Sequence, residues 1–183
     1  MKKNSNRQIL SVGLLLMAAF LLSCSGEKDN SQVQTGGDGS QVSTTAAPGN
    51  SPLFTAQDVS GKWRSADEWL GKQPVVINFW GTWCPPCRRE IPDLVKLNDE
   101  YSPKGVALVS LAVNDSPSSV KEYAANNNMN WVLLMAEDQM LVDYKVTTGI
   151  PTTIFIDKNG NEVTRFIGMR DYATLKQGFD AIL

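Results

Sequence analysis

The feature that most constrains this chain is a pair of cysteines that directly follows an apolar segment. Residues 74–80 read Pro-Val-Val-Ile-Asn-Phe-Trp, a β-branched and aromatic run typical of a strand buried on both faces. Cys84 and Cys87 come next, and after them Ile91 and Leu94 belong to an apolar pattern at helical spacing. The two cysteines are therefore predicted to lie where a buried strand passes into a helix.

This position predicts different chemical roles for the two cysteines. At a helix N-terminus, unpaired backbone N–H groups and the helix dipole favour a thiolate, which makes Cys84 the expected nucleophile. Cys87 follows about one helical turn later, so we expect it to be more buried and to resolve a mixed disulfide formed by Cys84. A purely structural disulfide is the weaker interpretation, because such a short loop gains little chain entropy.

The composition excludes several other kinds of site. The chain of 183 residues has no histidine and three cysteines, which removes histidine-based catalysis, His-ligated zinc and four-cysteine metal sites. Its formal net charge of -2 argues against a basic groove for nucleic acid. We therefore expect no metal, no nucleic-acid partner, and no cofactor other than a redox-active Cys84–Cys87 disulfide.

The N-terminal residues have the pattern of an export signal. Basic side chains precede an apolar run over residues 9–22, which is too short to span a membrane easily. The run ends in Leu-Leu-Ser-Cys, which resembles a bacterial lipoprotein signal in which Cys24 is lipidated after residues 1–23 are removed. The alternative is plain signal cleavage, which leaves Cys24 as a leftover thiol. The expected location is extracytoplasmic and lipid-anchored to a bacterial membrane, facing the periplasm in a Gram-negative cell.

Residues 24–52 are expected to be a lipidated cysteine followed by a flexible tether. The stretch is rich in Ser, Gly, Thr, Asn and Gln and has no aromatic residue, so it cannot bury enough apolar surface to offset its ordering entropy. Residues 53–183 are long enough for one catalytic domain but not for two domains with separate cores. We expect this domain to act as a monomer.

The order of the predicted elements in residues 53–183 indicates an α/β fold. A capping-box pattern at Ser65 predicts a short helix before the first buried strand. Further strands are predicted at residues 106–113, 130–134, 152–156 and 162–167, and helices at about 117–126, 139–145 and 171–183. Asn159-Gly160 predicts a tight hairpin turn between the last two strands. This order gives a mixed central sheet flanked by helices.

Two segments carry a family resemblance. Residues 78–92 read Asn-Phe-Trp-Gly-Thr-Trp-Cys-Pro-Pro-Cys-Arg-Arg-Glu-Ile-Pro, and residues 149–157 read Gly-Ile-Pro-Thr-Thr-Ile-Phe-Ile-Asp. Together they are similar to the active-site motifs of the membrane-anchored TlpA/ResA-like thiol-disulfide oxidoreductases, which are related to the AhpC/TSA redoxins. The resemblance covers about residues 53–183. It implies a thioredoxin-like fold with an inserted strand–helix element before the closing hairpin.

The resemblance also implies a substrate-binding set beside the cysteines. The Ile150–Pro151 peptide bond is expected to be cis and to face the Cys84–Cys87 pair, with the backbone of Ile150 available to an incoming polypeptide. Trp83, Ile150 and Pro151 are therefore the expected substrate contacts. Most X–Pro peptide bonds in folded proteins are trans, so a cis bond next to a dithiol indicates a functional site rather than an ordinary turn.

One residue departs from the thioredoxin pattern. Asn78 occupies the strand position where thioredoxins carry a buried Asp that helps to move the proton of the resolving cysteine, and an amide cannot titrate. Glu90, one helical turn after Cys87, is the nearest acid in sequence and a candidate proton relay. The competing expectation is that Glu90 forms an ion pair with a neighbouring arginine on the helix surface, so the proton acceptor stays unassigned.

The leading hypothesis from the sequence is a membrane-anchored reductase of protein disulfides. Its expected partners are disulfide-containing exported proteins, among them apocytochromes c during cytochrome c maturation, and a membrane electron donor of the thiol–disulfide type. The same cysteines would act as a disulfide oxidant if their potential were high enough. Two different functions compete with this hypothesis. One is a peroxiredoxin-type thiol peroxidase, which peroxide consumption would reveal, and the second is a copper carrier, which the absence of histidine disfavours.

Overall fold

The computed structural model describes residues 49–183. The predicted signal peptide, Cys24 and the tether up to residue 48 lie outside the described residues. Composition assigns residues 49–52 to the tether, but the structure places them on the domain: Ser51 is buried, and its N–H donates to the carbonyl of Gly160 at 3.1 Å. A polar composition is typical of linkers, yet it does not reveal that a hairpin turn far along the chain supplies hydrogen-bond partners.

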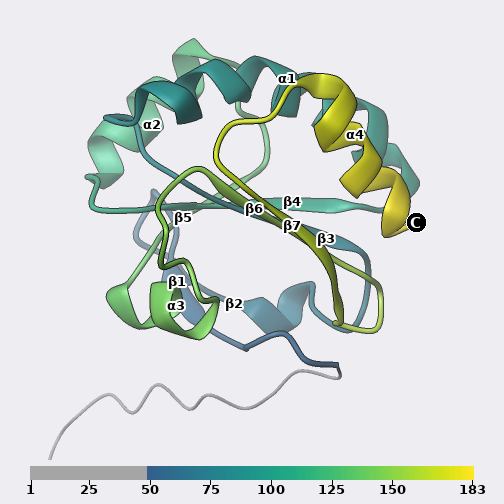
Figure 1. Ribbon diagram of the computed structural model, residues 1–183. Coiled ribbons are helices and arrows are strands. Elements are labelled where there is room, and N and C mark those ends of the chain that lie inside the picture. The colour runs from purple at the N-terminus through teal and green to yellow at the C-terminus, as the bar shows by residue number, and fades with distance from the viewer. Residues whose placement is uncertain (1–48) are drawn as a thin grey trace, which may run out of the picture. The chain divides into compact units, whose positions relative to one another are not determined.

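A five-stranded mixed sheet forms the centre of the domain (Figure 1), with the strand order β5-β4-β3-β6-β7. Its strands are β3 (Val75–Trp80), β4 (Ala107–Ala112), β5 (Val132–Met135), β6 (Thr152–Ile156) and β7 (Glu162–Ile167). The first three are parallel to one another, β6 pairs antiparallel with β3, and β7 pairs antiparallel with β6. The strand predicted before the cysteines is the central strand β3, and all of its residues are buried.

Helices cover both faces of this sheet, as predicted (Figure 1). One face carries α1 (Pro85–Tyr101), α2 (Pro117–Asn126) and α4 (Tyr172–Ala181), and a short 3-10 helix, η2 (Ser102–Lys104), follows α1. The other face carries α3 (Asp138–Asp143), the 3-10 helix η1 (Ala66–Glu68), and a two-stranded sheet of β1 (Thr55–Gln57) and β2 (Trp63–Ser65). Successive side chains of a strand point to opposite faces, so two separate apolar clusters form, one under each helix layer.

Local sequence signals explain where several elements begin. The side chains of Ser116 and Asp171 cap α2 and α4, each accepting a hydrogen bond from a backbone N–H of the first turn. The carboxylate of Asp157 accepts from the N–H groups of Asn159 and Asn161, both at 2.9 Å, which fixes the predicted hairpin turn. The β5–α3 segment is the inserted strand–helix element, located as expected between α2 and this hairpin.

The sequence did not predict the β1–β2 pair. Each strand has three residues, and of the six only Ala56 is buried, so neither contains an alternating pattern long enough to detect. The short helix predicted after Ser65 was expected to contain Trp69 and Leu70. In the structure η1 ends at Glu68, so these two buried residues lie outside it. These segments cover the sheet face opposite α1 and leave the fold class unchanged.

Candidate active site

The cysteine pair lies at the junction of β3 and α1, as predicted. Cys84 is the N-cap residue of α1, and its Sγ accepts a hydrogen bond from the backbone N–H of Cys87 at 3.3 Å. The two sulfurs form a disulfide with an S–S distance of 2.07 Å and a Cα–Cα distance of 5.3 Å. A sulfur that accepts an N–H bond at a helix N-terminus is favoured as a thiolate once the disulfide is reduced.

A groove with a volume of about 460 Å³ opens beside Cys84. Cys84 lines the groove and Cys87 does not. Of the two cysteines, only Cys84 therefore borders the space in which a ligand could lie. The walls are mainly apolar and include Val113 at the end of β4, Leu141 of α3 and Val146. The inserted strand–helix element therefore contributes directly to the surface next to the sulfur of Cys84.

Gly149 and Ile150, which directly precede Pro151, also line the groove. The Ile150–Pro151 peptide bond is cis, as the family resemblance implied. The Sγ of Cys84 lies 3.8 Å from the carbonyl oxygen of Ile150, although the two residues are 66 positions apart. The carbonyl of Pro151 accepts a hydrogen bond from Gly168 at 2.7 Å, which ties the segment to β7. Cys84 and Ile150 are therefore in direct contact, and both residues line the groove.

Trp83 presents an exposed aromatic ring next to Cys84. The residue is 56% exposed, yet its indole N–H donates to the carbonyl of Val113 at 2.9 Å, which fixes the orientation of the ring. Gly81 makes this arrangement sterically feasible, because a Cβ there would lie 2.8 Å from the indole nitrogen of Trp83. The role of Gly81 was missed from the sequence, since its reason is a contact formed only after folding.

Asn78 belongs to a neutral chain of hydrogen bonds across the sheet. Its side-chain N–H donates to the Oγ1 of Thr153 at 3.0 Å, and its oxygen accepts from the Oγ of Ser110 at 3.4 Å. Ser110 in turn accepts from the indole N–H of Trp131 at 2.9 Å. The position that holds a titrating Asp in thioredoxins is therefore filled here by a buried amide with both of its polar atoms paired.

Glu90 is buried, and the expected surface ion pair with a neighbouring arginine is wrong. One oxygen, Oε1, accepts a hydrogen bond from the backbone N–H of Arg170 at 3.1 Å, and the other, Oε2, has no partner among the described residues. Burial raises the pKa of Glu90 to about 7, although the Arg170 N–H and the Arg170 charge act in the opposite direction. In the sequence Glu90 directly follows two arginines, whereas in the structure packing against the loop before α4 removes its carboxyl group from water.

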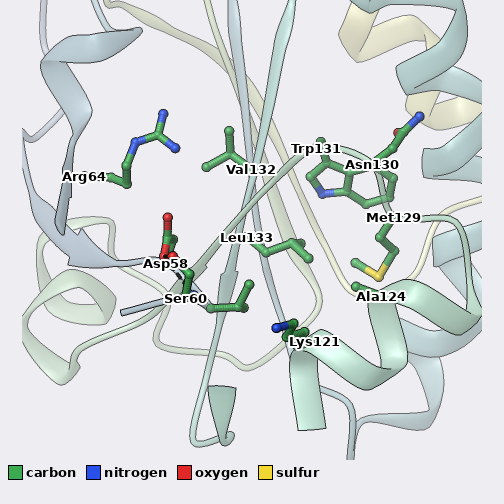
Figure 2. Close-up of a pocket in the computed structure, with 11 residues that line it drawn as sticks. Asp58, Ser60, Arg64, Lys121, Ala124, Met129, Asn130, Trp131, Val132 and Leu133 are labelled. Atoms are coloured by element: carbon green, nitrogen blue, oxygen red, sulfur yellow. Dashed lines mark hydrogen bonds between the residues drawn. The ribbon is translucent and has the colours of Figure 1, made fainter. Parts of the chain in front are cut away.

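A second cavity of about 460 Å³ lies at the edge strand β5 and shares no lining residue with the groove at Cys84. Figure 2 shows residues from the β1–β2 side, from β5 and from α2 around it, including Asp58, Arg64 and Lys121. The carboxylate of Asp58 accepts from Ser60, and the guanidinium of Arg64 pairs with Glu68. The carboxylate of Asp58 and the guanidinium of Arg64 thus already have partners within the chain, so the groove at Cys84 is the better candidate for the active site.

Within residues 49–183 no cluster of three His, Cys, Asp or Glu side chains is placed to hold a metal ion. Over the same residues, no helix combines the length and the apolar character needed to cross a membrane.

Comparisons with known proteins agree with this site. The model of the AhpC/TSA family matches residues 49–163. The thiol-disulfide oxidoreductase ResA of Geobacillus thermodenitrificans is 31% identical over 143 residues, which cover 78% of this chain and 81% of that protein. ResA of Geobacillus kaustophilus is 34% identical over 128 residues, which cover 69% and 72%.

A solved structure extends the likeness to three dimensions. A thiol:disulfide interchange protein of the thioredoxin family from Chlorobium tepidum has a TM-score of 0.66 and 32% sequence identity, and the match covers 75% of this chain and 98% of that one. The predicted thioredoxin-like fold is thereby confirmed. By its family model, its relatives and its fold, the chain belongs to the AhpC/TSA family and, within it, to the ResA-like thiol-disulfide oxidoreductases.

Proposed function

We propose that this protein reduces disulfides of exported proteins outside the cytoplasm, with Cys84 as nucleophile and Cys87 as resolving thiol. One observation carries the proposal: Cys84 lines an apolar groove beside Ile150, whereas Cys87 does not line that groove. Only one of the two sulfurs can therefore meet a bulky disulfide. This asymmetry is what a two-step thiol exchange needs.

In the first step, the thiolate of Cys84 attacks one sulfur of the substrate disulfide. The substrate S–S bond breaks, a mixed disulfide with Cys84 forms, and the other substrate sulfur leaves as a thiolate. Cys87 then attacks the sulfur of Cys84, which releases the second substrate thiol and closes the Cys84–Cys87 disulfide. The substrate gains two electrons and two protons, and the cysteine pair loses them.

The groove suits an extended segment of polypeptide rather than a small ion. Trp83, Leu141 and Ile150 present apolar surface to it, and burial of apolar area contributes most of the binding free energy at such sites. Trp83, Ile150 and Pro151 are the proposed substrate contacts. Such a segment would place its cystine at Cys84 with apolar neighbours against these walls.

Glu90 is the proposed acceptor of the Cys87 proton. It lies one turn along α1 from Cys87, where side chains three positions apart are neighbours, and its Oε2 is buried without a partner among the described residues. With a pKa raised by burial to about 7, its carboxyl can exchange a proton near neutral pH. The rate of the resolving step should then increase with pH as Glu90 ionises.

The cellular setting is proposed from the N-terminal sequence and from the family. Cys24 carries the lipid anchor, residues 24–48 form the tether, and the protein works as a monomer at the membrane. A membrane electron donor of the thiol–disulfide type returns the cysteines to the dithiol form, and apocytochromes c in cytochrome c maturation are proposed substrates. Mass spectrometry of the N-terminal peptide tests the anchor, since a free Cys24 thiol would contradict it.

A redox titration combined with substrate trapping tests the reductase proposal. The potential of the Cys84–Cys87 pair should lie well below the strongly oxidising value of about −120 mV, and Cys87→Ala should accumulate mixed disulfides with exported proteins in cells. Cys84→Ser is the control, because it keeps the fold but removes the attacking sulfur. A potential near that oxidising value would identify an oxidant, and rapid turnover of peroxide would identify a thiol peroxidase.

A further inference from the structure

Two arginines next to the cysteines differ from the other arginines of the domain. Residues 49–183 contain Arg64, Arg88, Arg89, Arg165 and Arg170. The guanidinium groups of Arg64 and Arg165 pair with glutamates, and that of Arg170 donates to the carbonyls of Gly168 and Met169. Arg88 and Arg89 are exposed, and neither makes a side-chain hydrogen bond or an ion pair with any residue of that range.

These two side chains form a small basic pocket on the helix side of the active site. A cavity of about 310 Å³ is lined by Pro85, Arg88, Arg89 and Tyr123. Pro85 also lines the groove at Cys84, so the basic pocket and the apolar groove adjoin across a single residue. A polypeptide held in the groove would therefore pass within reach of both guanidinium groups.

Aromatic packing holds one of the two arginines in place. The guanidinium carbon of Arg88 lies 5.6 Å from the ring centroid of Tyr123 on α2, and that ring lies 5.6 Å from the ring of the buried Trp80. A cation–π contact of this kind orients a guanidinium without using its N–H donors. The donors of Arg88 are thereby positioned but unoccupied, which reduces the ordering cost of binding an anion.

We propose that Arg88 and Arg89 bind an acidic side chain of the polypeptide whose disulfide reacts at Cys84, so that the enzyme prefers cystines flanked by Asp or Glu. This inference rests on the proposed function. Guanidinium groups match the geometry of a carboxylate and form charge-assisted hydrogen bonds with it. The chain as a whole has a net charge of -2 and therefore repels an acidic partner. The local basic pocket beside the groove attracts that partner, so it also orients the partner toward the face that carries Cys84.

A competing role for the arginines is to favour the thiolate of Cys84 by their charge alone. That role would change the reaction with every disulfide by the same factor. Recognition of a carboxylate changes the reaction with acidic substrates selectively. The preference between two matched substrates therefore separates the two roles.

The test uses the full chain and two disulfide-bonded model peptides, identical except that Glu residues flank the cystine in one and Gln residues in the other. At low salt the wild-type protein should reduce the Glu peptide with a kcat/KM about tenfold higher, and this ratio should fall as salt rises. In the Arg88→Gln/Arg89→Gln variant the ratio should fall to about one. Lys158→Gln is the matched control, because Lys158 is an exposed cation in the β6–β7 turn, at the opposite end of the sheet from Cys84.

Several outcomes would overturn the inference. They are a wild-type ratio of about one, a ratio that the arginine variant keeps, or an equal loss of preference in Lys158→Gln. The two peptides are also compared in the reverse reaction, in which the Cys84–Cys87 disulfide oxidises the reduced peptides. If the protein reduces neither peptide, the proposed function is contradicted. A preference for the Glu peptide in the oxidising reaction would still support binding of an acidic side chain by Arg88 and Arg89.

Discussion

Helix α1 has polar groups at both ends, and they are arranged in opposite ways. At its C-terminal end, the hydroxyl of Tyr101 donates to Asp180 and accepts from the ammonium of Lys176, which lies 2.7 Å away. Glu100 accepts from the hydroxyl of Tyr172 at 2.7 Å, and this bond holds its pKa below the usual range. At the N-terminal end, the arginines beside Cys87 have no ion-pair partner in residues 49–183, and Glu90 is buried with one oxygen unpaired.

This difference separates stability from chemistry within one helix. Paired polar groups lower the free energy of the folded state and have little left to offer a ligand. Buried or unpaired groups destabilise the fold locally, and they are the groups that can exchange protons or bind a partner. The C-terminal end of α1 should therefore respond to mutation in stability alone, and the N-terminal end should respond in activity.

Removal of the Tyr101 side chain should have the largest effect on stability. Tyr101 is fully buried, and its ring centroid lies 4.9 Å from that of Phe179. Tyr101→Ala should lower the free energy of unfolding by about 3–5 kcal/mol, measured by denaturant titration, because a large cavity remains. Tyr101→Phe keeps the ring and should lose about 1–2 kcal/mol. A change in the redox potential of the cysteines in either variant would contradict the expectation that the C-terminal end of α1 affects stability alone.

Glu90→Gln should have a smaller effect that depends on pH. The pKa of Glu90 is about 7 in the folded protein and about 4.5 when the carboxyl is free in water, so its stabilising contribution is complete below pH 4.5 and is lost as pH rises through 7. The wild-type free energy of unfolding should fall by about 3 kcal/mol across that range. Glu90→Gln, which cannot ionise, should not show this decrease. The chain has no histidine to obscure the result.

The same variant tests the proposed proton acceptor. Decay of the mixed disulfide in single-turnover experiments should be about a hundredfold slower in Glu90→Gln, and its increase with pH near 7 should disappear. The stability profile alone would change if Glu90 were merely a buried acid. An unchanged decay rate would therefore remove Glu90 from the mechanism while leaving its burial intact.

Lys176→Gln should have the smallest effect. The ammonium of Lys176 pairs with Asp180 at 2.9 Å, but both side chains are substantially exposed, so water and salt screen the pair. The melting temperature should fall by less than about 2 °C at moderate salt, and reduction of disulfides should be unchanged. A larger decrease that persists at high salt would show that this end of α1 depends on more than paired surface charge.

The sequence predicted the features that depend on neighbouring residues. The buried strand β3, the caps at Ser116 and Asp171 and the Asp157 turn each follow from short-range patterns, and so does the position of Cys84 at a helix N-terminus. The cis bond before Pro151 came from a family resemblance rather than from local physics. The short strands β1 and β2 escaped detection because their pattern is too brief.

By itself, the sequence determined where the two cysteines lie: a strand, a helix start and two cysteines one turn apart define a dithiol through local backbone geometry. Only the tertiary structure decided what surrounds those atoms. It brought Ile150 to Cys84 across 66 positions and the Arg170 N–H to Glu90 across 80. It also buried Glu90 and left Arg88 without a polar partner in residues 49–183. Burial and pairing depend on contacts between distant segments, and a linear pattern does not contain those contacts.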